Sequence, residues 1–135
     1  MLQQTSLSTN DLVVPLFIDE TISRKKPIGS MPDQVRYPIG GIGRVADGLW
    51  DQGLRAVLLF GIPKKKDAGA TGAYAENGVI QKAVREIKTV VPDMVVITDV
   101  CACEYTSHGH CGIIGKTRSG IFFFRDTKQK DRPQP

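Results

Sequence analysis

The stretch Leu54-Arg-Ala-Val-Leu-Leu-Phe-Gly-Ile62 decides the fold class, because it is a nearly unbroken apolar run of strand length. Residues 63–77 follow it as a polar segment rich in glycine and lysine, and residues 78–90 then place apolar side chains at helical spacing. A second apolar run, 94–100, begins after Pro92, which ends that helix. Apolar strands that alternate with amphipathic helices are typical of a parallel sheet covered on its faces, the α/β class.

The preceding part of the chain repeats this alternation. Residues 11–18 form a third apolar run, in which Pro15 favours an edge or an irregular position. Residues 21–40 hold several prolines and glycines and are predicted to be a loop. Residues 42–52 have apolar side chains at helical spacing, and Gly53 ends the predicted helix. The predicted order is strand–helix–strand–helix–strand, with chemistry expected at the C-terminal ends of the strands.

Composition and charge exclude several classes of protein. The chain of 135 residues is 41% hydrophobic and 24% charged, as in ordinary globular proteins. Six of the 18 basic residues, but only two of the 14 acidic ones, lie in residues 116–135, which we expect to be a solvated, disordered tail rather than a nucleic-acid site. No apolar run approaches the ~20 residues of a membrane span, and no secretory signal is visible. We therefore expect a cytoplasmic protein without membrane or nucleic-acid partners.

The three cysteines, Cys101, Cys103 and Cys111, are crowded into eleven residues, which favours a metal over a disulfide framework. Residues i and i+2 at a strand end point to the same side, and a loop containing Gly109 can return the third thiol to them. Three thiolates without a fourth cysteine resemble a catalytic zinc site with one open position. Three buried, unreactive cysteines are the structural alternative.

The neighbours of the cysteines leave two questions open. His108 or His110 is a candidate fourth ligand, which would close the site and make it structural. Asp99 is a candidate proton-transfer residue, and a role in capping the loop is an equal alternative.

The segment Asp-Val-Cys-Ala-Cys-Glu-Tyr-Thr-Ser-His-Gly-His-Cys-Gly, residues 99–112, resembles the zinc-binding signature of the porphobilinogen synthase (delta-aminolevulinic acid dehydratase) family. Further matches lie at residues 8–17, 30–32, 59–62 and 77–78, so the resemblance covers residues 2–114. It implies the first three β/α units of a (β/α)₈ TIM barrel. It also implies an octameric, zinc-dependent hydro-lyase that condenses two 5-aminolevulinate molecules to porphobilinogen in haem biosynthesis.

By position in this motif, the resemblance implies that Cys101, Cys103 and Cys111 are the zinc ligands and that Asp99 lies at the edge of the active site. Residues 1–114 are then the family's N-terminal part and residues 115–135 a divergent basic tail. The family's Schiff-base lysines belong to a region beyond this match, and no lysine of this chain corresponds to them. We therefore expect a truncated, inactive form; the alternatives are a zinc-binding or regulatory fragment and a non-functional truncation product.

Overall fold

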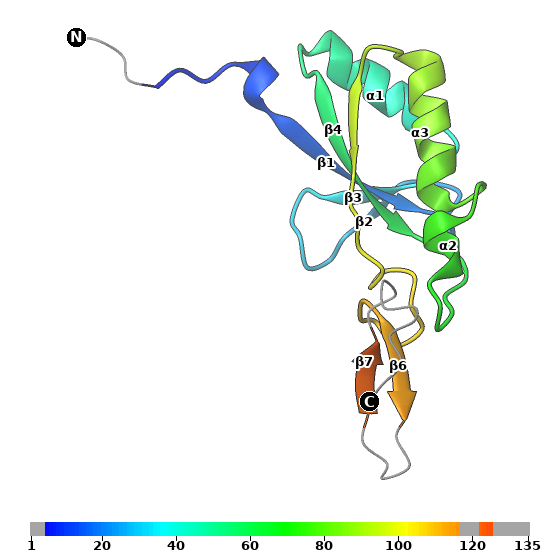
Figure 1. Ribbon diagram of the computed structural model, residues 1–135. Coiled ribbons are helices and arrows are strands. Elements are labelled where there is room, and N and C mark those ends of the chain that lie inside the picture. The colour runs from blue at the N-terminus through cyan, green and yellow to red at the C-terminus, as the bar shows by residue number, and fades with distance from the viewer. Residues whose placement is uncertain (1–4, 117–121, 126–135) are drawn as a thin grey trace.

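Three parallel strands form the centre of the fold in the computed structural model, which describes residues 5–116 and 122–125. Strand β1 (Val13–Asp19) pairs along its whole length with β4 (Ala56–Ile62), and β4 pairs with β5 (Val95–Thr98). The helices α1 (Ile42–Asp51) and α3 (Val79–Val90) connect these strands (Figure 1). The predicted α/β class and its strand–helix–strand–helix–strand order are confirmed.

The sheet is extended beyond β1 by two short strands, in the order β2-β3-β1-β4-β5. Strand β3 (Val35–Tyr37) runs parallel to β1, and β2 (Lys26–Pro27) runs antiparallel to β3. The prediction that residues 21–40 are only a loop was therefore wrong. Strands this short have no measurable alternation of apolar and polar residues, so the sequence could not indicate them.

Pro15 interrupts β1 at a point where the strand has only one neighbour. It lies opposite Leu58 of β4, whereas β3 contacts β1 only at Phe17 and Ile18. A proline is tolerated there because its missing N–H can face the unpaired side. The sequence-based expectation of an edge-like position is confirmed.

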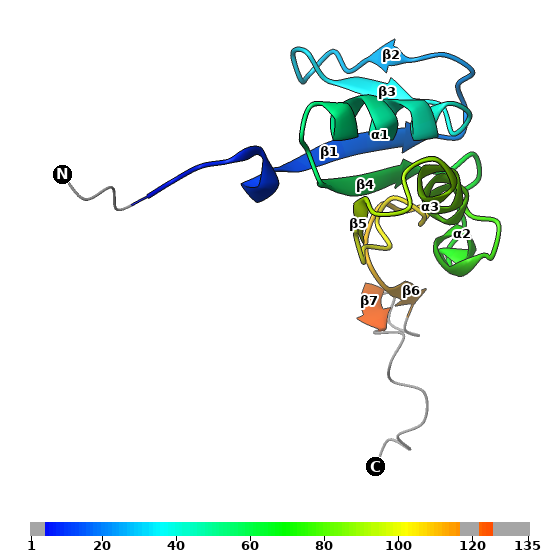
Figure 2. The ribbon, with the colours of Figure 1, turned by 90° about the horizontal axis from the view of Figure 1, so that it is seen from above.

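The main core lies between the sheet and the two long helices, which pack side by side over one face (Figure 2). Alternate side chains of β1 and β4 point into it, and both helices contribute the apolar stripe that their periodicity predicts. Its most buried members are Leu16, Ile18, Val57, Leu59, Ile42, Ala46, Val79, Ala83, Ile87 and Met94. In the part of the chain that the structure describes, no helix is long and apolar enough to cross a membrane.

The N-terminal end of α1 is capped by a residue of another helix, and its C-terminal end by a local turn. Gly41, at its N-cap, has no side chain to offer, and the carboxylate of Glu86 on α3 instead accepts hydrogen bonds from the Gly41 N–H (2.6 Å) and the Gly43 N–H (3.4 Å). At the other end Gly53 has φ of 87°, and the Leu54 N–H donates to the Leu49 carbonyl at 3.1 Å, a Schellman arrangement. The predicted stop at Gly53 is confirmed.

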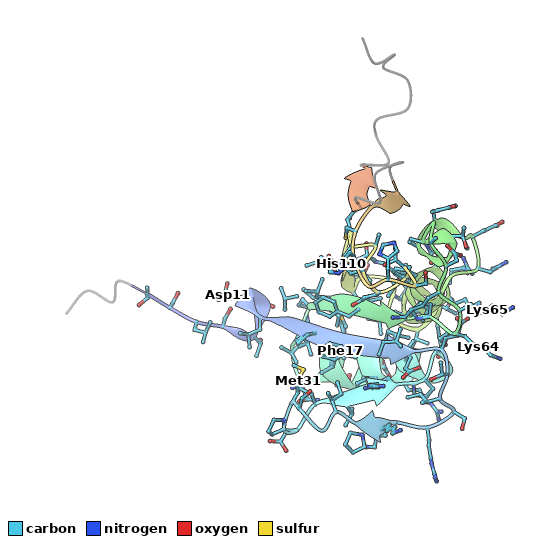
Figure 3. All side chains as sticks on the ribbon, turned by 90° about the horizontal axis from the view of Figure 1, so that it is seen from below. Asp11, Phe17, Met31, Lys64, Lys65 and His110 are labelled. Carbon is cyan, nitrogen blue, oxygen red and sulfur yellow. The ribbon has the colours of Figure 1, made fainter. Side chains whose placement is uncertain are left out.

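The opposite face of the sheet has no helix on it among the described residues, contrary to the expectation of cover on both faces. Val13, Val95 and Ile97 are 46%, 54% and 40% exposed. Phe17 and Phe60 stack across this face with ring centroids 5.4 Å apart, and Figure 3 looks onto it with Phe17 labelled on β1. A sheet with helices outside and apolar residues inside is the arrangement of a β/α barrel wall, whose inner face is buried only against other strands.

Two further strands lie near the C-terminal end. β6 (Ile113–Lys116) pairs antiparallel with β7 (Phe122–Arg125). Four residues of the segment expected to be a disordered tail, 122–125, thus pair with β6, and the assignment of 115–135 as a divergent tail stays a prediction. The rest of that prediction, residues 117–121 and 126–135, lies outside the described residues.

Candidate metal centre

Polar side chains gather where the parallel strands end. Glu20 follows β1, and its carboxylate accepts from the Lys64 N–H at 3.0 Å and from Lys82 Nζ at 2.9 Å. Strand β5 ends at Thr98, two residues before the end of the predicted strand 94–100. The next residues leave the sheet, and Val100 is 99% exposed. The carboxyl ends of parallel strands share one edge, so the segment after β5 is delivered to the place where β/α proteins carry their sites.

The three cysteine sulfurs meet just beyond β5. The Sγ atoms of Cys101, Cys103 and Cys111 all lie within 4.8 Å of one another. Cys111 Sγ is 3.5 Å from Cys101 Sγ and 3.2 Å from Cys103 Sγ. Three thiolates on one tetrahedral zinc would have sulfurs about 3.8 Å apart, given Zn–S bonds of about 2.3 Å. The cluster therefore has the size and donor chemistry that fit a thiophilic ion.

A hydrogen-bonded turn, rather than the pleat of a strand, brings Cys101 and Cys103 together. The N–H groups of Tyr105 and Thr106 both donate to the Ala102 carbonyl, at 2.9 and 3.0 Å. The expected geometry of i and i+2 on a strand was wrong, because β5 has already ended. The same turn buries the Thr106 hydroxyl, which donates to the His110 carbonyl at 2.9 Å and so holds the returning limb beside the first.

Neither histidine belongs to the group of candidate ligand atoms that the described residues bring together. His108 Nδ1 accepts a hydrogen bond from the His110 N–H at 3.3 Å, and the two rings stack with centroids 6.3 Å apart. His110 is labelled in Figure 3 on the loop beyond β5. Among the described residues, the group therefore consists of three sulfurs and no histidine nitrogen.

The thiols share protons unequally. Hydrogen bonds from Cys103 and from the Ala102 N–H (3.2 Å to Sγ) favour the thiolate of Cys111 and lower its pKa to about 7. The hydrogen bond to Cys111 has the opposite effect on Cys103 and raises its pKa to about 11. Without a cation, the cluster therefore loses one thiol proton easily, and loss of a second proton is unfavourable. A divalent ion would remove this repulsion and hold the thiols deprotonated.

In the metal-free chain, alkylation of Cys111 by iodoacetamide is expected to accelerate as the pH rises through about 7, since the thiolate is the nucleophile. Cys103 should stay largely protonated and slow until the pH approaches about 11. Peptide mass spectrometry of the rate of modification at each cysteine against pH measures both. Equal pH midpoints for the two residues would contradict the opposite pKa shifts of Cys111 and Cys103.

Two residues within the cysteine motif anchor it to the barrel wall, and the sequence analysis had given them no role. Glu104 Oε2 accepts a hydrogen bond from the Gly61 N–H of β4 at 3.2 Å, and burial raises the pKa of this carboxyl. Tyr105 is only 6% exposed, and burial raises its pKa to about 12. Their only sequence signal is an acidic and an aromatic residue placed directly after Cys103.

Asp99 lies exposed between β5 and the cysteines. Its negative charge contributes to the raised pKa values of Glu104 and Tyr105, so it faces the same end of the sheet. Its role in proton transfer stays a prediction.

The loop after β4 also contacts the cysteine loop, through a residue that the sequence analysis had not selected. The Asp67 N–H donates to the Tyr105 carbonyl at 3.1 Å, and the Ser107 N–H donates to the Asp67 carbonyl at 3.0 Å. No local pattern indicates this contact, because the partners are far apart in the chain.

A helix-backed parallel sheet with a three-thiol cluster at its carboxyl edge defines a β/α protein of barrel type with a candidate metal centre. The model of the delta-aminolevulinic acid dehydratase family matches residues 1–126, and the chain belongs to this family. The match runs past Ile114, whereas pairwise similarity to the relatives extends over about 114 residues. The division of the chain at residue 114 stays a prediction.

Relatives that carry this name are found in archaea and bacteria. The protein from Archaeoglobus fulgidus is 50% identical over 84% of this chain, and that from Escherichia coli is 40% identical over the same share. This chain spans 35% of the length of either relative.

A solved structure of delta-aminolevulinic acid dehydratase (porphobilinogen synthase) from Toxoplasma gondii, in complex with the reaction product porphobilinogen, is similar in fold. The TM-score is 0.80 at 27% identity, covering 89% of this chain and 34% of that one. This likeness agrees with the predicted partial (β/α)₈ barrel.

Proposed function

We propose that Cys101, Cys103 and Cys111 bind one Zn²⁺ and that this chain carries the metal centre of a porphobilinogen synthase. The observation that supports it most is the convergence of three Sγ atoms within 4.8 Å in a member of this family. Three thiolates, with no histidine or carboxylate joining them in residues 5–116 and 122–125, correspond to a zinc site that keeps a position for substrate or water.

The reaction that we propose for the whole protein is condensation of two 5-aminolevulinate molecules to porphobilinogen with loss of two waters. When bound, zinc would supply a Lewis acid for a carbonyl or amine of the substrate. The residues of this chain hold that site: the thiolates fix the ion, and Glu104 ties the loop to β4 through the Gly61 N–H. Asp99, exposed at the same edge, is the proposed proton-transfer group.

Covalent attachment of the substrate needs a nucleophilic lysine, and we propose that the family's Schiff-base lysines lie in the part of the relatives that this chain, which spans 35% of their length, does not match. We therefore expect this chain alone to bind zinc without producing porphobilinogen. Its assembly into an octamer also stays a prediction.

The test is zinc stoichiometry together with turnover, measured on the reduced chain. Equilibrium dialysis followed by elemental analysis is expected to give one zinc per chain, and a colorimetric porphobilinogen assay should detect no product. In the Co²⁺-substituted chain, 5-aminolevulinate should shift the visible bands if the fourth position is open. Absence of zinc binding would refute the metal centre, and product formation would refute the assignment of the lysines to another region. Cobalt bands that do not shift when 5-aminolevulinate is added would favour a zinc-binding fragment without catalytic function.

A further inference from the structure

The loop after β4 holds the cysteine loop through main-chain hydrogen bonds centred on one residue. The Asp67 N–H and carbonyl bond on either side of Thr106, with Tyr105 and Ser107, and Asp67 and Thr106 form a parallel β-bridge. Through this bridge, the segment 63–70 pairs with the cysteine loop as a neighbouring strand would. The turn Ala102–Thr106, which positions Cys103, therefore rests on Asp67.

The side chain of Asp67 folds the loop that presents this main chain. Its carboxylate accepts hydrogen bonds from the Gly69 N–H at 2.9 Å, from the Thr71 N–H at 3.0 Å and from the Thr71 hydroxyl. These bonds hold the pKa of Asp67 below its ordinary value, with the Thr71 hydroxyl as the largest cause. The carboxylate thus closes the turn that leads into α2 (Thr71–Tyr74).

This turn needs such a clamp because its backbone is otherwise unfavourable. Ala70 has φ of 52°, a left-handed conformation that non-glycine residues seldom adopt. The preceding Lys64, Lys65 and Lys66 are exposed, whereas Ala70 itself is buried in the core. Tyr105 packs against α2 at Gly72, where an added Cβ would lie 3.3 Å from its ring. The carboxylate therefore supports both the bridge and this packing surface.

On the basis of the proposed function, we infer that Asp67 is a positioning residue for the metal centre: its carboxylate folds the 67–71 turn, whose main chain holds the cysteine loop in the geometry that binds zinc. Asp67 touches none of the sulfurs; it acts through Tyr105 and Thr106. Loss of such an outer contact typically weakens metal binding by about 10–100-fold.

The test compares Zn²⁺ dissociation constants, measured by competition with a chromophoric chelator, for the wild-type chain and Asp67→Ala. We expect about 10-fold or greater weakening in Asp67→Ala. Asp67→Asn, whose amide oxygen can still accept from the Gly69 and Thr71 N–H groups, should recover most of the affinity. Thr71→Val, which removes only the hydroxyl, should give a smaller loss. Asp93→Ala is the control, because Asp93 is exposed in the loop before β5, away from the cysteines.

A second readout separates positioning from general destabilisation. The thiolate-to-Co²⁺ charge-transfer bands of Asp67→Ala should change in intensity and position, while those of Asp93→Ala match the wild type. If Asp67→Ala does not fold, the same comparison in Thr71→Val decides the question. Wild-type affinity and spectra in a folded Asp67→Ala variant would overturn the inference. If that variant is unfolded, wild-type affinity and spectra in a folded Thr71→Val variant would overturn it instead. Failure of the wild-type chain itself to bind zinc would instead overturn the proposed metal centre.

Discussion

Replacing Cys103 with serine is expected to weaken zinc binding by on the order of 10²-fold or more, since each ligand contributes several kcal/mol to a thiolate zinc site. A serine hydroxyl is not deprotonated near neutral pH and cannot replace the thiolate. Only two sulfurs would then remain, Cys101 Sγ and Cys111 Sγ, 3.5 Å apart. The measurement is the dissociation constant for Zn²⁺ from chelator competition.

Ser107→Ala is the matched control for this substitution. Ser107 lies exposed on the same loop and takes part in the bridge to Asp67 only through its main-chain N–H, which alanine keeps. It should bind zinc as the wild type does. An unchanged dissociation constant in Cys103→Ser would show that the ion, if any, binds elsewhere.

Gly61→Ala should lower the free energy of unfolding by about 1–3 kcal/mol, the usual effect of overpacking a filled interior. An added Cβ would lie 2.7 Å from Tyr105 Oη and 2.8 Å from the side chains of both Ile80 and Val79. Tyr105 belongs to the cysteine loop, whereas Ile80 and Val79 belong to α3. The added methyl group therefore meets side chains on both sides and cannot avoid one clash by moving toward the other. The expected result is a lower midpoint in urea denaturation.

The same substitution should also disturb the cysteine loop. Displacement of Tyr105 would strain the hydrogen bond from the Gly61 N–H to Glu104, 3.2 Å long in the native fold, and zinc affinity should fall together with stability. Gly29→Ala is the control, because nothing lies within 4 Å of the Cβ that it would add. Equal midpoints for Gly61→Ala and Gly29→Ala would contradict the close packing of the loop on β4.

Local patterns in the sequence determined the type of most elements and the residues of the candidate site. The apolar runs and the stripe Val79, Ala83, Ile87 predicted strands and a helix that the structure contains, because periodicity reports which side of an element is buried. The three cysteines were found together because their ligand chemistry is concentrated within eleven residues.

Tertiary structure decided how these elements are held. The strands β2 and β3 are too short to be periodic, and only the order of the strands leaves β1 with a single neighbour at Pro15. The cap on α1 comes from Glu86 on another helix, and the cysteine loop rests on Asp67. The partners in these last two contacts are distant in the chain, and a local sequence pattern does not specify which distant residues will meet.

The uncovered sheet face illustrates the same limit. Apolar character of Phe17 and Phe60 shows that both should be buried, and the sequence by itself determined that much. Which surface buries them depends on the curvature and closure of the whole sheet. Hydrophobicity is non-directional, so it specifies that a face must be covered, whereas the geometry of the assembled strands selects what covers it.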